Sequence, residues 1–216
     1  MLFVNFKTYP LGTSEAAVRL AQTCFQVAAA TGVEIVPIVQ VVDLYRVHQE
    51  VGEHLWTQHV DGIGYGPHTG WILPAAVRDS GAAGTLLNHS EHKLEQDKLT
   101  TAVQFAKRVG LQVLFCASSL EELKSVTALK PDFIAYEPPE LIGTTTSVSQ
   151  AKPEIIKQAV SLLPHGIPLI VGAGIHASTD VTTALQLGAT GVLVSSDILT
   201  ADHPQEELED LAQALK

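Results

Sequence analysis

The sequence predicts an α/β protein that forms one (β/α)8 barrel, a single domain over residues 1–216 with a parallel eight-stranded sheet. Strand-like and helix-like segments alternate along the whole chain. Most strand-like segments are continuous apolar runs, which is typical of strands buried on both faces of a parallel sheet. Eight units in 216 residues leave about 27 residues each, close to the least that a strand, a helix and two short loops occupy.

The eight predicted strands end at polar or turn-forming residues. They cover residues 2–6, 33–39, 59–62, 85–88, 112–116, 133–136, 168–171 and 191–194. A doubly wound sheet is the alternative, but it needs fewer strands and usually carries a glycine-rich turn after the first one. Residues 5–10 read NFKTYP and contain no GxGxxG motif, so the barrel is favoured.

Helices are predicted between the strands from capping residues and helix breakers. We expect Ser14 to cap a helix that runs to about residue 30 and is closed by Gly32. Gly110, Pro164 and Gly188 end three further helices. Besides the first, the predicted helices cover residues 95–109, 153–163, 179–187 and 206–215, with shorter candidates at 43–50, 73–79 and 120–129.

Composition excludes several classes of protein. The chain is 46% hydrophobic and 17% charged, which indicates a globular protein with a substantial core. We expect no membrane span and no secretion signal, and the two cysteines suit a reducing compartment, so a cytoplasmic location is predicted. The net charge of -10 makes a nucleic-acid partner improbable but still allows a small anionic ligand held by backbone N–H groups.

Polar residues end several predicted strands, where a βα barrel carries its reactive groups. Taken singly, Lys7 reads as a solvated loop lysine and Glu91 as a helix cap. Glu137 is harder to dismiss, because an acid at the mouth of an apolar barrel needs a partner or a raised pKa. A lysine, a histidine, a carboxylate and Gly or Ser turns at one mouth together indicate proton transfer on a phosphorylated substrate.

These motifs resemble those of triosephosphate isomerases, in order and spacing, over almost the whole chain. The matching phrases are Asn5-Phe6-Lys7, Asn88-His89-Ser90-Glu91, Ala135-Tyr136-Glu137-Pro138, Leu141-Ile142-Gly143-Thr144, Val171-Gly172-Ala173-Gly174 and Gly191-Val192-Leu193-Val194. The short length and the phrase Glu137-Pro138-Pro139-Glu140-Leu141-Ile142-Gly143 are most similar to the compact, archaeal-type branch. The resemblance implies interconversion of dihydroxyacetone phosphate and D-glyceraldehyde 3-phosphate, in glycolysis and gluconeogenesis, without a cofactor. No spacing among the histidines is typical of a metal site, so no metal is predicted.

The resemblance also implies the catalytic roles. Glu137 is the expected base, and His89 is a neutral imidazole that donates to the substrate carbonyl. A short helix starting at residues 90–92 would disfavour the imidazolium form. Lys7 supplies positive charge, Asn5 fixes its geometry, and Glu91 is a supporting carboxylate near Lys7.

Phosphate binding is implied for Ile142, Gly143, Gly174, Ser195 and Ser196, the first two in a closing loop over residues 138–149.

Two residues depart from the family pattern. Thr145 stands where many relatives have glycine, and Asp197 stands where a small residue is usual. A carboxylate about 5 Å from a phosphate dianion weakens binding by on the order of one to several kcal/mol, unless Asp197 caps the helix that begins at residue 198.

Two rival functions remain open from the sequence. One is another barrel enzyme that acts on a phosphorylated sugar, such as an aldolase or a phosphoribosyl isomerase, but a Schiff-base aldolase would want a lysine at the end of an interior strand, where Glu137 stands. A pseudoenzyme on an inherited scaffold is supported only by Asp197 and Thr145. A homo-oligomer, dimer or tetramer, is implied by the resemblance, with the loop around Thr69 at the interface, although an isolated surface loop is an equally good interpretation of residues 65–71.

Overall fold

Eight parallel strands close into a barrel in the order in which they occur along the chain. The computed structural model describes residues 1–52, 54–138, 153–164 and 166–216. The strands are β1 (Leu2–Asn5), β2 (Ile35–Val39), β3 (Leu55–Thr57), β4 (Ala82–Leu87), β5 (Gln112–Ala117), β6 (Phe133–Tyr136), β7 (Leu169–Val171) and β8 (Gly191–Val194). β1 pairs with both β2 and β8, with Leu2 opposite Ile35 on one side and Val192 on the other. The predicted barrel is therefore confirmed.

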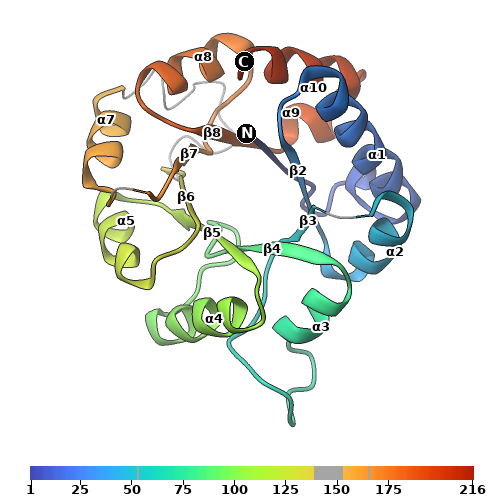
Figure 1. The fold of residues 1–216 in the computed structure, drawn as a ribbon, viewed down its shortest axis with the longest axis vertical. Coiled ribbons are helices and arrows are strands. Elements are labelled where there is room, and N and C mark those ends of the chain that lie inside the picture. The colour runs from blue at the N-terminus through green and yellow to red at the C-terminus, as the bar shows by residue number, and fades with distance from the viewer. Residues whose placement is uncertain (53, 139–152, 165) are drawn as a thin grey trace.

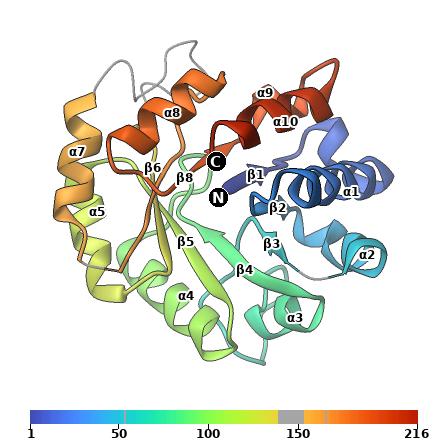
Figure 2. The same cartoon turned by 45° about the horizontal axis from the view of Figure 1, so that its top comes forward.

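Helices form the outer layer of the barrel, as Figure 1 shows. They are α1 (Ser14–Thr31), α2 (Val41–Val51), α3 (Pro74–Asp79), α4 (Gln96–Arg108), α5 (Leu120–Val126), α7 (Pro153–Leu162), α8 (Ser178–Gln186), α9 (Ser196–Leu199) and α10 (Pro204–Gln213), with short 3-10 turns at Pro10–Gly12 and Thr127–Leu129. Within this outer layer α10 packs beside α1, so the C-terminal helix lies against the N-terminal one (Figure 2).

Alternate residues of each strand face opposite layers of core, which explains the continuous apolar runs. In β1, Phe3 belongs to the cluster inside the barrel, whereas Leu2 and Val4 belong to the layer beneath the helices. Phe3, Trp56 and Phe133 meet edge to face inside the barrel, with ring centroids 5.3 to 5.9 Å apart. This packing fills the interior and leaves the carboxyl ends of the strands to carry polar groups.

The predicted third strand at residues 59–62 is wrong. The strand is the shorter run Leu55–Thr57, whose Trp56 fills the barrel interior. The predicted segment instead forms a loop in which the Asp61 carboxylate accepts the Ile72 amide at 2.6 Å, and Asp61 N donates to Ile72 O. A hydrogen-bonded turn at Asp61 satisfies backbone groups that a strand would have given to the sheet.

Two predicted helix starts are also wrong. Ser14 lies inside α1, after the capping position of Thr13, and its amide donates to the Asp43 carboxylate at 3.0 Å. Residues 90–92 form a turn closed by a bond from His92 N to His89 O, and α4 begins only at Gln96. No helix N-terminus therefore lies at His89 within the part of the chain that the structure describes.

Candidate active site

A cavity of about 440 Å³ lies at the carboxyl ends of the strands. Its lining includes all of the predicted site residues that lie within the described part of the chain: Asn5, Lys7, His89, Glu91, Glu137, Gly174, Ser195 and Ser196. Gly172, His176 and Asp197 also border it. Ile142, Gly143 and Thr145 lie outside the described residues. Side chains from five strand ends, far apart in sequence, thus meet around one space.

Lys7 is held in an unusual backbone conformation directly after β1. Its φ angle of 47° lies in the left-handed region, which costs a residue with a side chain on the order of 1 to 3 kcal/mol. Hydrogen bonds on both sides of the residue hold it there: Lys7 N donates to Asn5 Oδ1 at 3.1 Å, and Gln58 Nε2 donates to Lys7 O at 2.9 Å. The ammonium group pairs with Glu91 Oε1 at 2.6 Å. Asn5 and Glu91 therefore fix the position of this cation in the cavity.

His89 follows β4 and is 8% exposed. The amide of Glu91 donates to His89 Nδ1 at 3.2 Å, so Nδ1 acts as an acceptor and a neutral ring carries its hydrogen on Nε2. That Nε2 lies 3.7 Å from Glu137 Oε1. The tautomer is thus set by a backbone amide in a turn, whereas the short helix expected to disfavour the imidazolium form does not lie at residues 90–92.

Glu137 follows β6 directly and is 3% exposed. Its amide donates to Ala117 O at 2.8 Å, which anchors the residue to β5. Its Oε2 atom is buried without a hydrogen-bond partner among the described residues. A buried carboxylate oxygen without a partner is costly, and such atoms are typical of sites that receive a ligand.

Cys116 and Gly172 enclose this carboxyl group. Burial raises the pKa of the Cys116 thiol well above its ordinary value, and the charge and hydrogen bonding of Glu137 raise it further. Cys116 is therefore a protonated packing residue beside Glu137. A side chain at Gly172 would begin 2.6 Å from Glu137 Cγ, so glycine there gives the carboxyl group its room.

The opposite side of the cavity is formed by the ends of β7 and β8. Gly174 has a left-handed φ of 64°, which glycine adopts without strain. Ser195 occupies the capping position of α9, and its hydroxyl is buried with no hydrogen-bond partner in residues 1–52, 54–138, 153–164 and 166–216. Small residues and an unsatisfied hydroxyl thus border this end of the cavity.

Asp197 does not cap the helix, contrary to one of the two predicted outcomes. It lies in the first turn of α9, and its Oδ1 is 2.6 Å from His176 Nδ1. His176 follows β7 by a few residues, and its amide donates to the Asp180 carboxylate at 3.0 Å. The sequence analysis did not single out His176, although its place just after a strand end was a usable signal for this pair.

Membrane-spanning helices and clusters of metal ligands are both absent from the described residues. None of the helices in residues 1–52, 54–138, 153–164 and 166–216 combines the length and the hydropathy that a membrane span requires. Nor does that part of the chain bring three or more His, Cys, Asp or Glu side chains into an arrangement that could hold a metal ion.

Comparisons with known proteins show the family of this chain. The family model described as triosephosphate isomerase matches residues 1–215. The triosephosphate isomerase of Methanosarcina acetivorans is 39% identical over 213 residues, covering 97% of this chain and 96% of that protein. That of Saccharolobus solfataricus is 41% identical over 212 residues, covering 97% and 93%. The crystal structure of the Bartonella henselae enzyme, at 23% identity, has the same fold, with a TM-score of 0.71 over 99% of this chain and 96% of that one. The chain belongs to the triosephosphate isomerase family.

Proposed function

We propose that this protein interconverts dihydroxyacetone phosphate and D-glyceraldehyde 3-phosphate by proton transfer through an enediolate. The observation that carries the proposal is the convergence of Lys7, His89 and Glu137 on one cavity, with His89 Nε2 3.7 Å from Glu137 Oε1. A carboxylate, a neutral imidazole and an ammonium group are the three groups that such a reaction needs.

Glu137 is the base in this mechanism. Its carboxylate removes a proton from the carbon next to the substrate carbonyl, and the electron pair of that C–H bond forms the enediolate. The same carboxyl group then returns the proton to the neighbouring carbon. Glu137 is only 3% exposed but borders the cavity, and its buried Oε2 atom has no hydrogen-bond partner among the described residues, so that oxygen is available to the substrate.

His89 and Lys7 stabilise the negative oxygen that develops. The Nε2–H of His89, fixed by the Glu91 amide on Nδ1, donates to the carbonyl oxygen and moves a proton between the two substrate oxygens. Lys7 brings a positive charge to the enediolate, with Asn5 and Glu91 holding it in place. Because these groups are already oriented, little reorganisation is needed when charge develops.

The phosphate group is assigned to the opposite side of the cavity. Gly174, Ser195 and Ser196 border it, and the buried Ser195 hydroxyl is a donor of suitable chemistry. Ile142 and Gly143 are assigned from the family resemblance: the Gly143 amide reaches the phosphate and Ile142 covers the base. We further infer that residues 1–216 form one domain. The enzyme is assigned to the cytoplasm and to glycolysis and gluconeogenesis.

A homo-oligomer is proposed with the loop around Thr69 at the interface. That loop, between β3 and α3, projects away from the barrel at the bottom of Figure 1 and exposes 81% of Tyr65 and 49% of Trp71. A hollow of about 300 Å³ beside the active site is bordered by the exposed Val41 and Val42. Exposed apolar side chains next to a hollow are typical of a protein interface.

A coupled assay with D-glyceraldehyde 3-phosphate tests the proposed activity. The unmodified protein should turn the substrate over, and Glu137→Ala should lose at least about a thousandfold in kcat. Glu206→Gln, an exposed acid on α10, is the matched control and should keep full activity. A protein that binds 2-phosphoglycolate without measurable turnover would instead be a pseudoenzyme, and this result would reject the proposal.

A further inference from the structure

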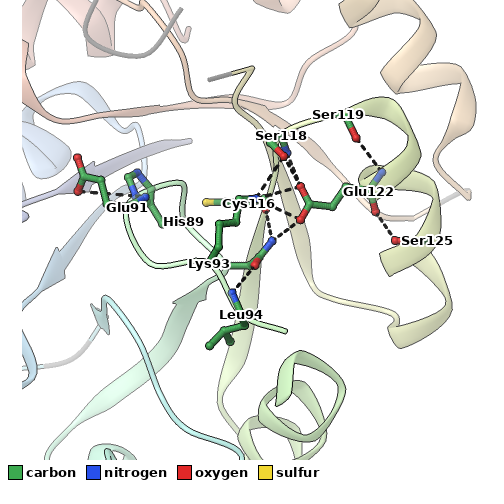
Figure 3. Close-up of polar contacts among 10 residues, drawn as sticks. His89, Glu91, Lys93, Leu94, Cys116, Ser118, Ser119, Glu122 and Ser125 are labelled. Carbon is green, nitrogen blue, oxygen red and sulfur yellow. Dashed lines mark hydrogen bonds and ion pairs between the residues drawn. The ribbon is translucent and has the colours of Figure 1, made fainter. Parts of the chain in front are cut away.

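The carboxylate of Glu122, in the first turn of α5, lies at the centre of a hydrogen-bonded network with Ser118 and Lys93 (Figure 3). Its Oε1 accepts from Asn88 Nδ2 at 2.6 Å, and its Oε2 accepts from Ser118 N and Ser118 Oγ at 2.7 and 2.6 Å. Lys93 Nζ lies 3.1 and 3.0 Å from the two oxygens. Partial burial raises the pKa of Glu122, but the bonds from Ser118, Lys93 and Asn88 outweigh burial and lower it below its ordinary value. The group is therefore an ionised anchor.

Asn88 connects this anchor to the active site. It is 2% exposed, and its φ of 62° lies in the left-handed region. Its Nδ2 also donates to Cys116 O at 3.1 Å, and its Oδ1 accepts from Leu94 N at 3.0 Å. Both amide hydrogens and the amide oxygen are thus used. Because Asn88 directly precedes His89, its backbone angle decides the direction in which the His89 side chain leaves the strand.

The loop from Asn88 to Leu94 carries two residues of the candidate active site. His89 faces Glu137, and Glu91 pairs with Lys7. The loop is a turn without regular secondary structure, so its shape depends on side-chain bonds at its two ends. Asn88 and Leu94 are those ends, and Lys93, next to Leu94, is bonded to Glu122 directly.

We propose that Glu122 is a positioning residue for the isomerase reaction, which fixes His89 and Glu91 by holding Asn88 and Lys93. This inference rests on the proposed function. Glu122 lies outside the cavity lining and touches neither Lys7, His89 nor Glu137 through any bond described above. It acts through Asn88, and a displacement of about 1 Å at the reacting groups is enough to cost on the order of a hundredfold in rate.

A purely structural role for Glu122 has to be separated from this one. The Glu122 amide donates to Ser119 Oγ at 3.1 Å, so the residue also belongs to the cap of α5. Loss of a cap lowers stability and leaves the kinetics of the folded enzyme unchanged. Glu122→Gln keeps the backbone cap and the shape of the side chain, but its NH2 group cannot accept the bonds that the replaced oxygen received.

The experiment compares Glu122→Gln with Glu121→Gln, an exposed acid in the same helical turn. We expect Glu122→Gln to lower kcat at least about tenfold while KM changes less than twofold, because the reacting groups move and the phosphate side does not. Glu121→Gln should keep both constants. Unchanged kcat in Glu122→Gln, with only a lowered unfolding temperature, would overturn the proposal.

Nuclear magnetic resonance of the His89 ring gives a readout that does not need turnover. The ring nitrogens are assigned from their disappearance in His89→Gln, and the bond from the Glu91 amide to Nδ1 is followed by its chemical shifts. We expect these shifts to change in Glu122→Gln and not in Glu121→Gln. Changed shifts in a protein without isomerase activity would reject the proposed function and show only that Glu122 orients the His89 ring, whereas identical shifts would reject the positioning role.

A second variant keeps the test valid if Glu122→Gln does not fold. Glu122→Asp retains the charge and the α5 cap but withdraws the carboxylate from Asn88 by one methylene group. The same fall in kcat and the same ring shifts are expected. Wild-type values of both in a folded Glu122→Asp protein would refute the inference.

Discussion

The substitution Gly172→Ala tests the placement of Glu137 most directly. Gly172 follows β7, and its backbone does not have a positive φ, so alanine is compatible with the local conformation. The added Cβ would lie 2.6 Å from Glu137 Cγ, 2.8 Å from Oε1 and 3.0 Å from Cδ. Ordinary contacts begin at 3.4 Å, so the side chain has to retreat by about 0.8 Å.

The magnitude follows from that displacement. A shift of about 1 Å at a reacting group costs on the order of a hundredfold in rate, equal to about 2.7 kcal/mol of activation free energy. We therefore expect Gly172→Ala to lower kcat by roughly thirty- to a hundredfold in the coupled assay. Overpacking should also destabilise the fold by about 1 to 3 kcal/mol, measured by urea unfolding.

Gly64→Ala is the control for this substitution. A Cβ at Gly64 would meet only Phe105 Cε1, at the ordinary distance of 3.4 Å. This variant should keep the wild-type kcat and the wild-type free energy of unfolding. A folded Gly172→Ala protein with kcat within twofold of wild type would refute the reasoning, because the displaced carboxylate would then not be the reacting group.

Three further predictions concern charges and thiols. His176→Asn removes the imidazole from the Asp197 carboxylate, which otherwise accepts only from Ser196 Oγ among the described residues, and should raise KM about tenfold at unchanged kcat. Adding Asp197→Asn should restore KM; a rise that persists in the double variant would contradict the charge argument. Because hydrogen bonds lower the pKa of Glu122 below 4.5, its stabilisation is fully present above that pH and is lost as the pH falls through the folded-state pKa. The difference in urea midpoint between wild type and Glu122→Gln should therefore narrow as the pH is lowered from 7 to 3. A difference that stays constant would contradict this pH dependence. Burial raises the pKa of Cys24 to about 12 and that of Cys116 well above its ordinary value, so neither thiol should react with Ellman's reagent until guanidinium unfolds the chain. Rapid labelling of the native protein would argue against this burial.

The barrel could be predicted from the sequence because its signals are local. Apolar runs, helix breakers and polar strand ends are each read from a few neighbouring residues. The position of the third strand was predicted wrongly because the interactions that define it are not local. Trp56 packs inside the barrel against Phe3 and Phe133, which are distant in sequence. The three-residue run that contains it is too short to stand out from the polar residues that follow.

Of the candidate site, the sequence alone indicates only the residues that stand at the ends of strands. Lys7, His89 and Glu137 stand out as candidates because each follows an apolar run and matches a family motif. The long-range contacts around the cavity cannot be read in this way, since the bond from Asn88 to Glu122 joins residues 34 apart and that from His176 to Asp197 joins residues 21 apart. Pairings of this kind depend on which strands become neighbours, and no motif records them.

The pairing of β1 with β8 has a consequence for synthesis of the chain. Leu2 lies opposite Val192, and Val192 N donates to Met1 O at 3.2 Å. β1 therefore leaves the ribosome about 190 residues before β8 and acquires this second neighbour late. Until then the nascent protein has an open sheet edge that can pair with other chains. A chain truncated before β8 would keep that edge permanently and should accumulate as aggregates.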